Sequence, residues 1–274
     1  MRASELNILF LGDLVGRAGR HAVRDQLPRL LEKHSYDCII ANCENSAGGF
    51  GITETICDEM DEYGINVITL GNHTWDQREI FGWIHRKPHV VRPINYPQTA
   101  PGVGHTFFEC EKGRILVINA MGRLFMDALD DPFRIVDDLL KNIALQRDCD
   151  AVIVDFHAEA TSEKQAFATY LDGRVSLVVG THTHVPTADH RIMPYGTGYQ
   201  SDAGMCGDYD SILGMEKDEP VNRFVNKINS KRFETSKGEG TLAGLAIQTD
   251  GHTGLCRKIS PIRLGGALSE IWPE

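Results

Sequence analysis

The 274-residue sequence contains no C-x-x-C pair, although it has seven cysteines. An odd number of cysteines without such spacing argues against both a disulfide framework and a zinc–cysteine site. Several of the cysteines stand in apolar runs, as in "DCII". We therefore expect reduced and mostly buried thiols, which are typical of a cytoplasmic protein.

Long apolar runs are also missing, and none approaches the length of a membrane span. The N-terminal "NILFLG" is short, lies close to Glu5 and Asp13, and lacks a cleavage-like site, which favours a first strand over a signal peptide. Basic residues are outnumbered, since 28 Lys and Arg face 38 Asp and Glu. This balance excludes a broad basic face for duplex nucleic acid. A small phosphate ester stays open as a substrate, because bound metal ions reverse the charge of a site locally.

The composition, with 42% hydrophobic and 24% charged residues, is that of a soluble globular protein. No repeat or linker divides the chain, so we predict one domain over residues 1–274. Short apolar segments alternate with helical patterns, which predicts an α/β fold. The expected strands are Asn7–Leu11, Cys38–Asn42, Val67–Leu70, Ile115–Asn119, Ala151–Phe156 and Leu177–Val179. The expected helices are His21–Lys33, Thr53–Tyr63, Asp76–His85, Pro132–Gln146 and Ser162–Leu171, with Thr53 and Ser162 as N-caps.

Two segments favour loops. Residues 86–104 hold four prolines, which disfavour both helix and central strand, and residues 196–214 are rich in glycine. Near the C-terminus, the "TDG" turn between two apolar stretches predicts a hairpin.

The stretch "SLVVGTHTHVPTAD" places His182 and His184 one residue apart, just after an apolar run. In an extended segment, residues i and i+2 point to the same side. Both imidazoles would then face one point, which suits a pair of metal ligands. A polar surface turn is the alternative interpretation, and the decision depends on whether the rest of the chain supplies further ligands.

Five predicted strands each end in a polar cluster. The candidate metal ligands are Asp13 in "GDLVG", Glu44 and Asn45 in "NCENSAGG", Asn72 in "GNHTWD", His157 in "DFHAEAT", and His182 and His184 in "GTHTH". In open α/β sheets, ligands bind outside the carboxyl ends of the strands, so these side chains are expected to meet. A nitrogen–oxygen set without thiolate suits Mn²⁺, Fe²⁺ or Zn²⁺. The set is too large for one ion, which predicts two divalent ions sharing a carboxylate.

The order of these motifs resembles the calcineurin-like metallophosphoesterases, whose usual pattern is D-x-H, GDxxD, GNH(D/E), H and GHxH. It is more similar to the YmdB-type bacterial phosphodiesterases, which lack the D-x-H histidine and have Glu-Asn in place of Asp in the second motif. Both departures occur here, in "LGDLVG" and "ANCENSAGGFGIT". The segments "TLGNHTWD", "VDFHAEATSEK", "VVGTHTHVPTAD" and "SDAGMCGDYDS" extend the resemblance over nearly the whole chain.

Other folds with a His-x-His pair fit less well. A site like that of the metallo-β-lactamases needs H-x-H-x-D-H, but Pro186 stands where its Asp should be. The amidohydrolases place H-x-H after an early strand, whereas this pair is late in the chain.

The resemblance implies two facing β-sheets flanked by helices, a four-layer αββα sandwich. It also implies a division of the ligands between two metal ions, with iron, manganese or both expected and zinc as a further candidate. Asp13, Glu44, Asn45 and His184 would hold the first ion, and Glu44, Asn72, His157 and His182 the second. Glu44 would therefore bridge the two ions.

The same resemblance implies hydrolysis of small phosphodiesters by a hydroxide between the metals. The expected substrates are 2′,3′-cyclic nucleotides, with 3′,5′-cAMP as a second candidate. His73 would be the catalytic residue that protonates the leaving oxygen, or alternatively a residue that only orients the phosphate. A phosphomonoesterase with the same site and a non-catalytic, metal-bound regulatory protein remain as alternatives. His73 would be dispensable in the regulatory protein. A homo-oligomer is compatible with all three.

Overall fold

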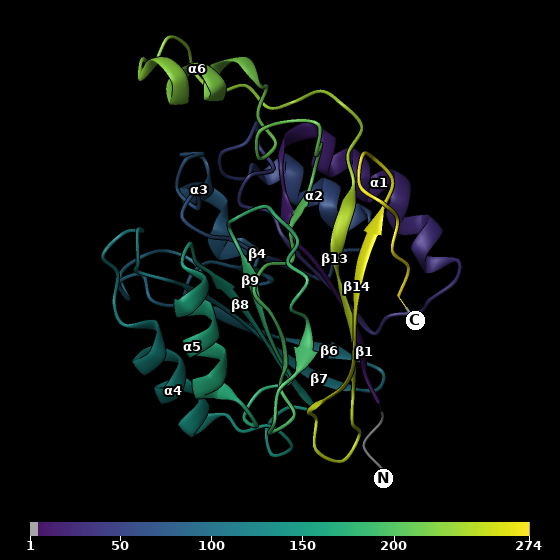
Figure 1. Cartoon of the computed structure of the whole chain (residues 1–274). Helices are drawn as coiled ribbons and strands as arrows, with labels where there is room; N and C mark the ends of the chain where they lie inside the picture. Colours follow the sequence, from purple (N-terminus) through teal and green to yellow (C-terminus); the bar gives the residue numbers. More distant parts are fainter. Residues whose placement is uncertain (1–4, 274) are drawn as a thin grey trace.

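The computed structural model describes residues 5–273, in which two six-stranded sheets lie face to face between layers of helices (Figure 1). The first sheet has the order β14 (Cys256–Leu264), β13 (Leu242–Thr249), β1 (Asn7–Leu11), β3 (Cys38–Asn42), β4 (Val67–Thr69) and β5 (Val90–Val91). The second has the order β10 (Arg191–Ile192), β11 (Gly198–Gln200), β9 (Leu177–Thr181), β8 (Ala151–His157), β7 (Gly113–Met121) and β6 (His105–Cys110). A separate parallel pair joins β2 (Asp13–Leu14) to β12 (Met205–Cys206).

Helices cover the outer face of each sheet. The helices α1 (Gly16–Leu31), α2 (Glu54–Glu62) and α3 (Ile80–Trp83) pack on the first sheet, and α4 (Pro132–Asn142) and α5 (Thr161–Leu171) pack on the second. A third apolar layer fills the space between the sheets, and Phe10 and Ile40 of the first sheet meet Val117 and Ile153 of the second there. The central strands are thus buried on both faces, which explains their continuous apolar sequences. The predicted four-layer αββα sandwich is confirmed.

The predicted strands are all present, and two of them reach further toward the polar clusters than expected. Strand β8 includes His157, and β9 extends to Thr181. The C-terminal hairpin is also confirmed, because β13 and β14 pair antiparallel around the "TDG" turn. There, a carboxylate oxygen of Asp250 accepts the backbone N–H groups of His252 and Thr253.

Helix boundaries differ more from the prediction. Helix α1 begins at Gly16, five residues before the expected start at His21. A Cβ at Gly19 would lie 2.3 Å from the carbonyl oxygen of Cys206, so only glycine lets this turn pack against β12. Helix α4 ends at Asn142, before the expected Gln146, because the Asp148 carboxylate accepts the Ala144 N–H and turns the chain.

Two other helical predictions were wrong in part. Residues 76–79 form turns, and the predicted helix is reduced to α3 and a 3₁₀ turn at Ile84–Arg86. Thr53 caps α2 as predicted, accepting the N–H of Ile56, but α5 follows Ala160 and has no side-chain cap, so Ser162 is not its N-cap.

Both predicted loops contain short strands. Strand β5 lies within residues 86–104, and β11 and β12 lie within residues 196–214. The sequence interpretation also missed the edge strand β6 and helix α6 (Asp218–Asn226), which projects at the top of Figure 1.

The cysteines and helices agree with the remaining expectations. All seven cysteines are free, and six of them are buried, as predicted. Among residues 5–273, no helix is long and apolar enough to cross a membrane.

Candidate metal centre

The carboxyl ends of strands from both sheets meet at one edge of the sandwich, where Asp155 of β8 ties them together. Its carboxylate accepts the amide of Asn42 in β3 at 2.9 Å and the hydroxyl of Thr69 in β4 at 2.5 Å. It also accepts the hydroxyl of Thr181 in β9 at 2.7 Å. Because Asp155 is fully buried, this network fixes the distance between the two sheets at the point where the predicted ligands follow.

The closest contacts among predicted ligands surround Nε2 of His157. This atom lies 2.9 Å from Oδ1 of Asn72. Oε1 of Glu44 and Nδ1 of His182 each lie 3.1 Å from it. Ligand atoms of Glu44, His157 and His182 all fall within 4.8 Å of one another, as a common cation requires. The structure therefore brings together all four residues predicted for one ion.

The charges at this point favour a cation. Burial alone would lower the pKa of His157, but the carboxylates of Glu44, Asp13 and Asp155 outweigh it and raise that pKa to about 9. Burial would raise the pKa of Glu44, yet the facing His157 lowers it to about 2. Burial and the neighbouring His157 lower the pKa of His182 to about 3. The buried carboxylates thus stabilise positive charge beside neutral imidazole nitrogen.

Hydrogen-bond partners orient each of the three imidazoles. The Thr181 hydroxyl gives its proton to Asp155, so it accepts Nδ1–H of His157 at 2.9 Å and directs Nε2 toward the other candidate ligands, where a metal ion would take the place of a proton. The carboxylate of Glu159 lies 3.2 Å from Nε2 of His182, which leaves Nδ1 bare. The tautomers are assigned from these partners. A histidine that binds a metal usually donates its other N–H in this way.

The carbonyl of Leu213 orients the third imidazole, accepting Nδ1–H of His184 at 3.0 Å. Nε2 of His184 then faces Asp13, 4.0 Å from Oδ1. The Asp13 carboxylate also accepts the N–H of His182 through Oδ2, at 3.1 Å. These contacts join the "GDLVG" motif at the end of β1 to the "GTHTH" motif at the end of β9.

Two buried oxygens among the ligands predicted for the first ion lack hydrogen-bond partners among residues 5–273. They are Oδ1 of Asp13 and Oδ1 of Asn45. The Asn45 amide is held in orientation by its NH₂ group, which donates to the Gly49 carbonyl at 3.0 Å. A buried oxygen without a partner is costly, and coordination of a cation would remove that cost. The residues Asp13, Asn45 and His184 therefore fit the first of the two expected ions.

The backbone of the His-x-His pair is not extended, which corrects the geometry expected from the sequence. His182 has φ +95° and His184 has φ +64°, a left-handed region in which residues other than glycine are uncommon. Each such residue costs roughly 1–3 kcal/mol, and strain of this kind is concentrated at functional sites. The two imidazoles reach the centre by a strained turn, through contacts with His157 and Asp13 respectively.

His73 borders the centre without contributing its side chain to it. Its backbone N–H donates to Oε2 of Glu44 at 3.0 Å, and its Nδ1 lies 2.8 Å from the Asp76 carboxylate. The ring of Phe50 packs edge-on against the imidazole, with centroids 5.1 Å apart. The His73 side chain is 27% exposed and lines a cavity of about 370 Å³ together with Glu44 and His182. It can therefore face a bound molecule.

The sequence interpretation missed the residues that support these side chains. They are Asn42, Thr69, Asp76, Asp155, Glu159, Thr181 and Leu213. One signal was available, because an Asp inside the otherwise apolar run of "AVIVDFH" is expected to be buried and then needs partners. The other partners are common turn and strand-end residues with no distinguishing pattern.

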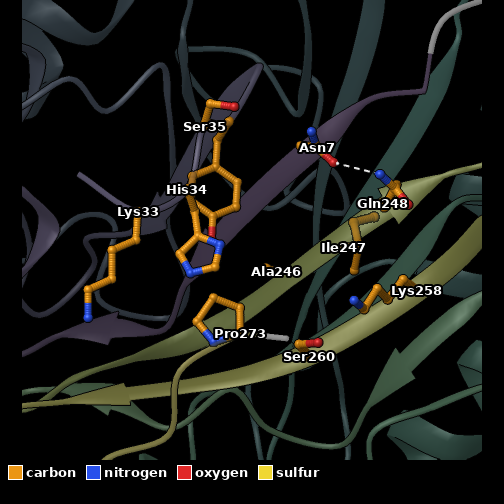
Figure 2. A pocket seen from close by; sticks show the side chains of 11 residues that line it. Asn7, Lys33, His34, Ser35, Ala246, Ile247, Gln248, Lys258, Ser260 and Pro273 are labelled. Atoms are coloured by element: carbon orange, nitrogen blue, oxygen red, sulfur yellow. Dashed lines mark hydrogen bonds between the residues drawn. The ribbon is translucent and has the colours of Figure 1, made fainter. Parts of the chain in front are cut away.

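Two other features of the structure resemble binding sites. Cys57, Asp61 and His89 also lie within metal-ligand reach of one another, but the Lys87 ammonium already pairs with Asp61 at 2.9 Å. A hydrogen-bonded cluster explains these contacts. The cavity of about 320 Å³ in Figure 2 lies beside Asn7, at the start of β1, and thus at the opposite end of the parallel strands from the centre. It contains none of the predicted ligands.

Several known proteins are similar to this chain over most of its length. A protein of Bacillus subtilis (strain 168) named 2′,3′-cyclic-nucleotide 2′-phosphodiesterase is 46% identical over 257 residues, covering 94% of this chain and 96% of its own length. A crystal structure of a hypothetical protein from Thermus thermophilus has 41% identity and a TM-score of 0.87, covering 94% of this chain and 99% of that one. A crystal structure of a novel phosphatase from Mycoplasma pneumoniae has 37% identity and a TM-score of 0.88, covering 96% of this chain and 94% of that one.

The sequence profile described as YmdB-like protein matches residues 9–262, which include every candidate ligand from Asp13 to His184. Together with relatives of this identity and coverage, the match shows that the chain belongs to the YmdB-like protein family.

Proposed function

We propose that the protein is a metal-dependent phosphodiesterase that hydrolyses small 2′,3′-cyclic nucleotides. The buried convergence of Glu44, Asn72, His157 and His182 around one point is the observation that carries this proposal. The name of the Bacillus subtilis relative, at 46% identity, supports the substrate class.

Two divalent transition-metal ions, iron or manganese in preference to zinc, are proposed to occupy the centre. Asp13, Glu44, Asn45 and His184 would hold the first ion, and Glu44, Asn72, His157 and His182 the second. When bound, ions of this kind neutralise the charge of a phosphate and supply a nucleophile at neutral pH. The uncharged amides of Asn45 and Asn72 keep the net negative charge of the ligand set low, so an anionic ester is not repelled.

His73 is proposed to protonate the departing oxygen. With Nδ1 held by Asp76, the imidazole presents Nε2 as the atom that carries or receives a proton on the cavity side. Histidine is the side chain most often used in general acid catalysis. The backbone N–H of His73 is fixed by Glu44, so the position of the acid is coupled to the proposed bridging carboxylate.

A phosphomonoesterase with the same residues is the second candidate, favoured by the relative from Mycoplasma pneumoniae described as a phosphatase. One experiment separates the candidates. Protein purified without chelator is analysed for metal, and kcat/KM is measured on 2′,3′-cAMP, 3′,5′-cAMP and 3′-AMP. The proposal expects bound metal and the highest kcat/KM on 2′,3′-cAMP. Faster hydrolysis of 3′-AMP would favour the monoesterase. Metal without any hydrolysis would favour a regulatory protein.

A further inference from the structure

The cavity beside the metal centre has two chemically different walls. Its polar wall includes His73 and four of the candidate ligands, which are Glu44, Asn45, His182 and His184. Its other wall is apolar and comes mainly from one excursion of the chain, residues 212–233, which includes α6. The apolar lining residues of this excursion are Ile212, Leu213, Met215, Pro220, Phe224 and Phe233. The volume, about 370 Å³, is within the range of small-molecule sites.

This apolar wall is attached to the metal centre. The carbonyl of Leu213 accepts the N–H of His184, so the beginning of the excursion is fixed by a candidate ligand. Its two ends are joined to each other, since Glu216 N–H donates to the Glu234 carbonyl at 2.8 Å and Met215 pairs with Thr235. The wall therefore keeps a defined position relative to the polar residues.

Within the excursion, Arg223 and Glu219 fix the position of Phe233. The guanidinium of Arg223 donates to Glu219 at 2.8 Å and to the Lys231 carbonyl at 2.6 Å. It also lies over the Phe233 ring, 3.8 Å from the centroid. The guanidinium thus covers one face of the Phe233 ring and is itself held by Glu219 and Lys231. The rest of the ring lines the cavity.

Phe224 is the unusual residue of this wall. It is 75% exposed although it is a large apolar side chain, and it lines the same cavity as Phe233 and His73. An exposed aromatic residue beside a candidate metal centre suits a ligand with both an apolar and an anionic part. A nucleotide has both parts, in its base and its phosphate. Aromatic side chains bind any base through its π-face.

We propose that Phe224 and Phe233 bind the base of a nucleotide by stacking while its phosphate lies at the candidate metal centre. This inference rests on the proposed function for its substrate class. Because stacking does not depend on hydrogen bonds to the base edge, the wall selects nucleotides over base-free sugar phosphates and discriminates little among bases.

Equilibrium binding tests the wall without relying on catalysis. Calorimetry on the metal-loaded protein compares adenosine 3′-monophosphate with the 3-phosphate of methyl riboside, which lacks the base. Stacking contributes enough per base for tenfold or tighter binding of the nucleotide. Phe224→Ala should remove most of this preference and leave the affinity for the riboside phosphate unchanged. Equal affinities of the wild type for both ligands would overturn the inference.

Val225→Ala is the matched control, because Val225 is 71% exposed on the same helix and is not among the residues that line the cavity. It should change neither affinity. If Phe224→Ala lowers the affinity for both ligands equally, α6 supports the site as a whole, which contradicts base stacking. If the wild type binds nucleotides with the expected preference but hydrolyses no ester, the proposed function fails and the wall stands. If the wild type hydrolyses the ester but does not prefer the ligand with a base, the proposed function stands and base stacking fails.

Discussion

The carboxylate of Asp202 holds Thr183, the residue that separates His182 from His184. Its Oδ2 accepts the Thr183 backbone N–H at 3.0 Å and the Thr183 hydroxyl at 2.7 Å. The same oxygen accepts Nζ of Lys164 from α5 at 2.8 Å, and both side chains of this ion pair are 1% exposed. The strained turn of the two candidate ligands is thus held by a buried ion pair.

Lys164→Met should destabilise the protein strongly, because it leaves the Asp202 carboxylate buried without its cation. Breaking a buried pair on one side costs roughly 3–5 kcal/mol. Urea unfolding of the wild type and the variant measures the difference in the free energy of unfolding. The double variant Lys164→Met/Asp202→Asn is the control. It should recover part of the loss, since residues that interact directly are not additive. Strict additivity would contradict the coupling.

The sequence predicted the layers of the fold well because its signals are local and repeated. Strand "CIIAN" is buried on both faces, and its apolar run carries that information directly. The same holds for "AVIVDFH", in which the polar residue at the strand end is already a candidate ligand. Strand ends of a parallel sheet meet by topology alone.

The missing parts depend on contacts that no local pattern reveals. Helix α6 is short and contains Pro220, so its sequence gives a weak helical signal. Its residues line the cavity together with Phe233, which follows the helix in the chain. The left-handed backbone of His182 is imposed by tertiary contacts of the kind that Asp202 makes with Thr183. The orienting role of Thr181 exists only because Asp155 takes its proton. Hydrogen-bond partners of this kind come together only in the folded structure.

Thr181→Val should weaken metal binding by about 10–100-fold, the usual effect of losing a partner behind a ligand histidine. The substitution keeps the shape of the side chain but removes the oxygen that accepts Nδ1–H of His157. Titration with a competing chelator measures the affinity. Thr181→Ser, which keeps the hydroxyl, is the matched control and should retain most of the affinity. Equal affinity in the wild type and Thr181→Val would remove Thr181 from the site.

Protein purified without chelator should contain about two transition-metal ions per chain. Glu44→Ala should lose both, because its buried carboxylate is the one proposed to be a ligand of each ion. Elemental analysis after gel filtration measures the content. Glu109→Gln is the control, since this carboxylate is 68% exposed on β6, pairs with Arg114 and does not line the cavity beside the centre. A single tightly held ion, unchanged in Glu44→Ala, would contradict the two-ion centre.

His73→Ala separates an enzyme from a sensor. The His73 imidazole bonds to Asp76 and packs against Phe50, neither of which is a candidate ligand, so the variant should keep its fold and its metals. General acid catalysis contributes about 10²–10⁴-fold, and it matters most for a poor leaving group such as a ribose hydroxyl. We therefore expect kcat on a 2′,3′-cyclic nucleotide to fall by roughly two orders of magnitude or more. Asp76→Asn should cause a smaller loss, because it only misorients the imidazole.

Two esters with different leaving groups distinguish the possible roles of His73. In a diester with an acidic phenol, the phenolate leaves without a proton. His73→Ala should therefore slow the hydrolysis of this diester much less than that of the cyclic nucleotide. Comparing kcat on both esters, for wild type and variant, measures this difference. Equal losses would mean that the imidazole stabilises charge on the phosphoryl oxygens and does not protonate the leaving oxygen. Unchanged rates on both would exclude His73 from the mechanism, and bound metal in such a protein would then favour the regulatory alternative.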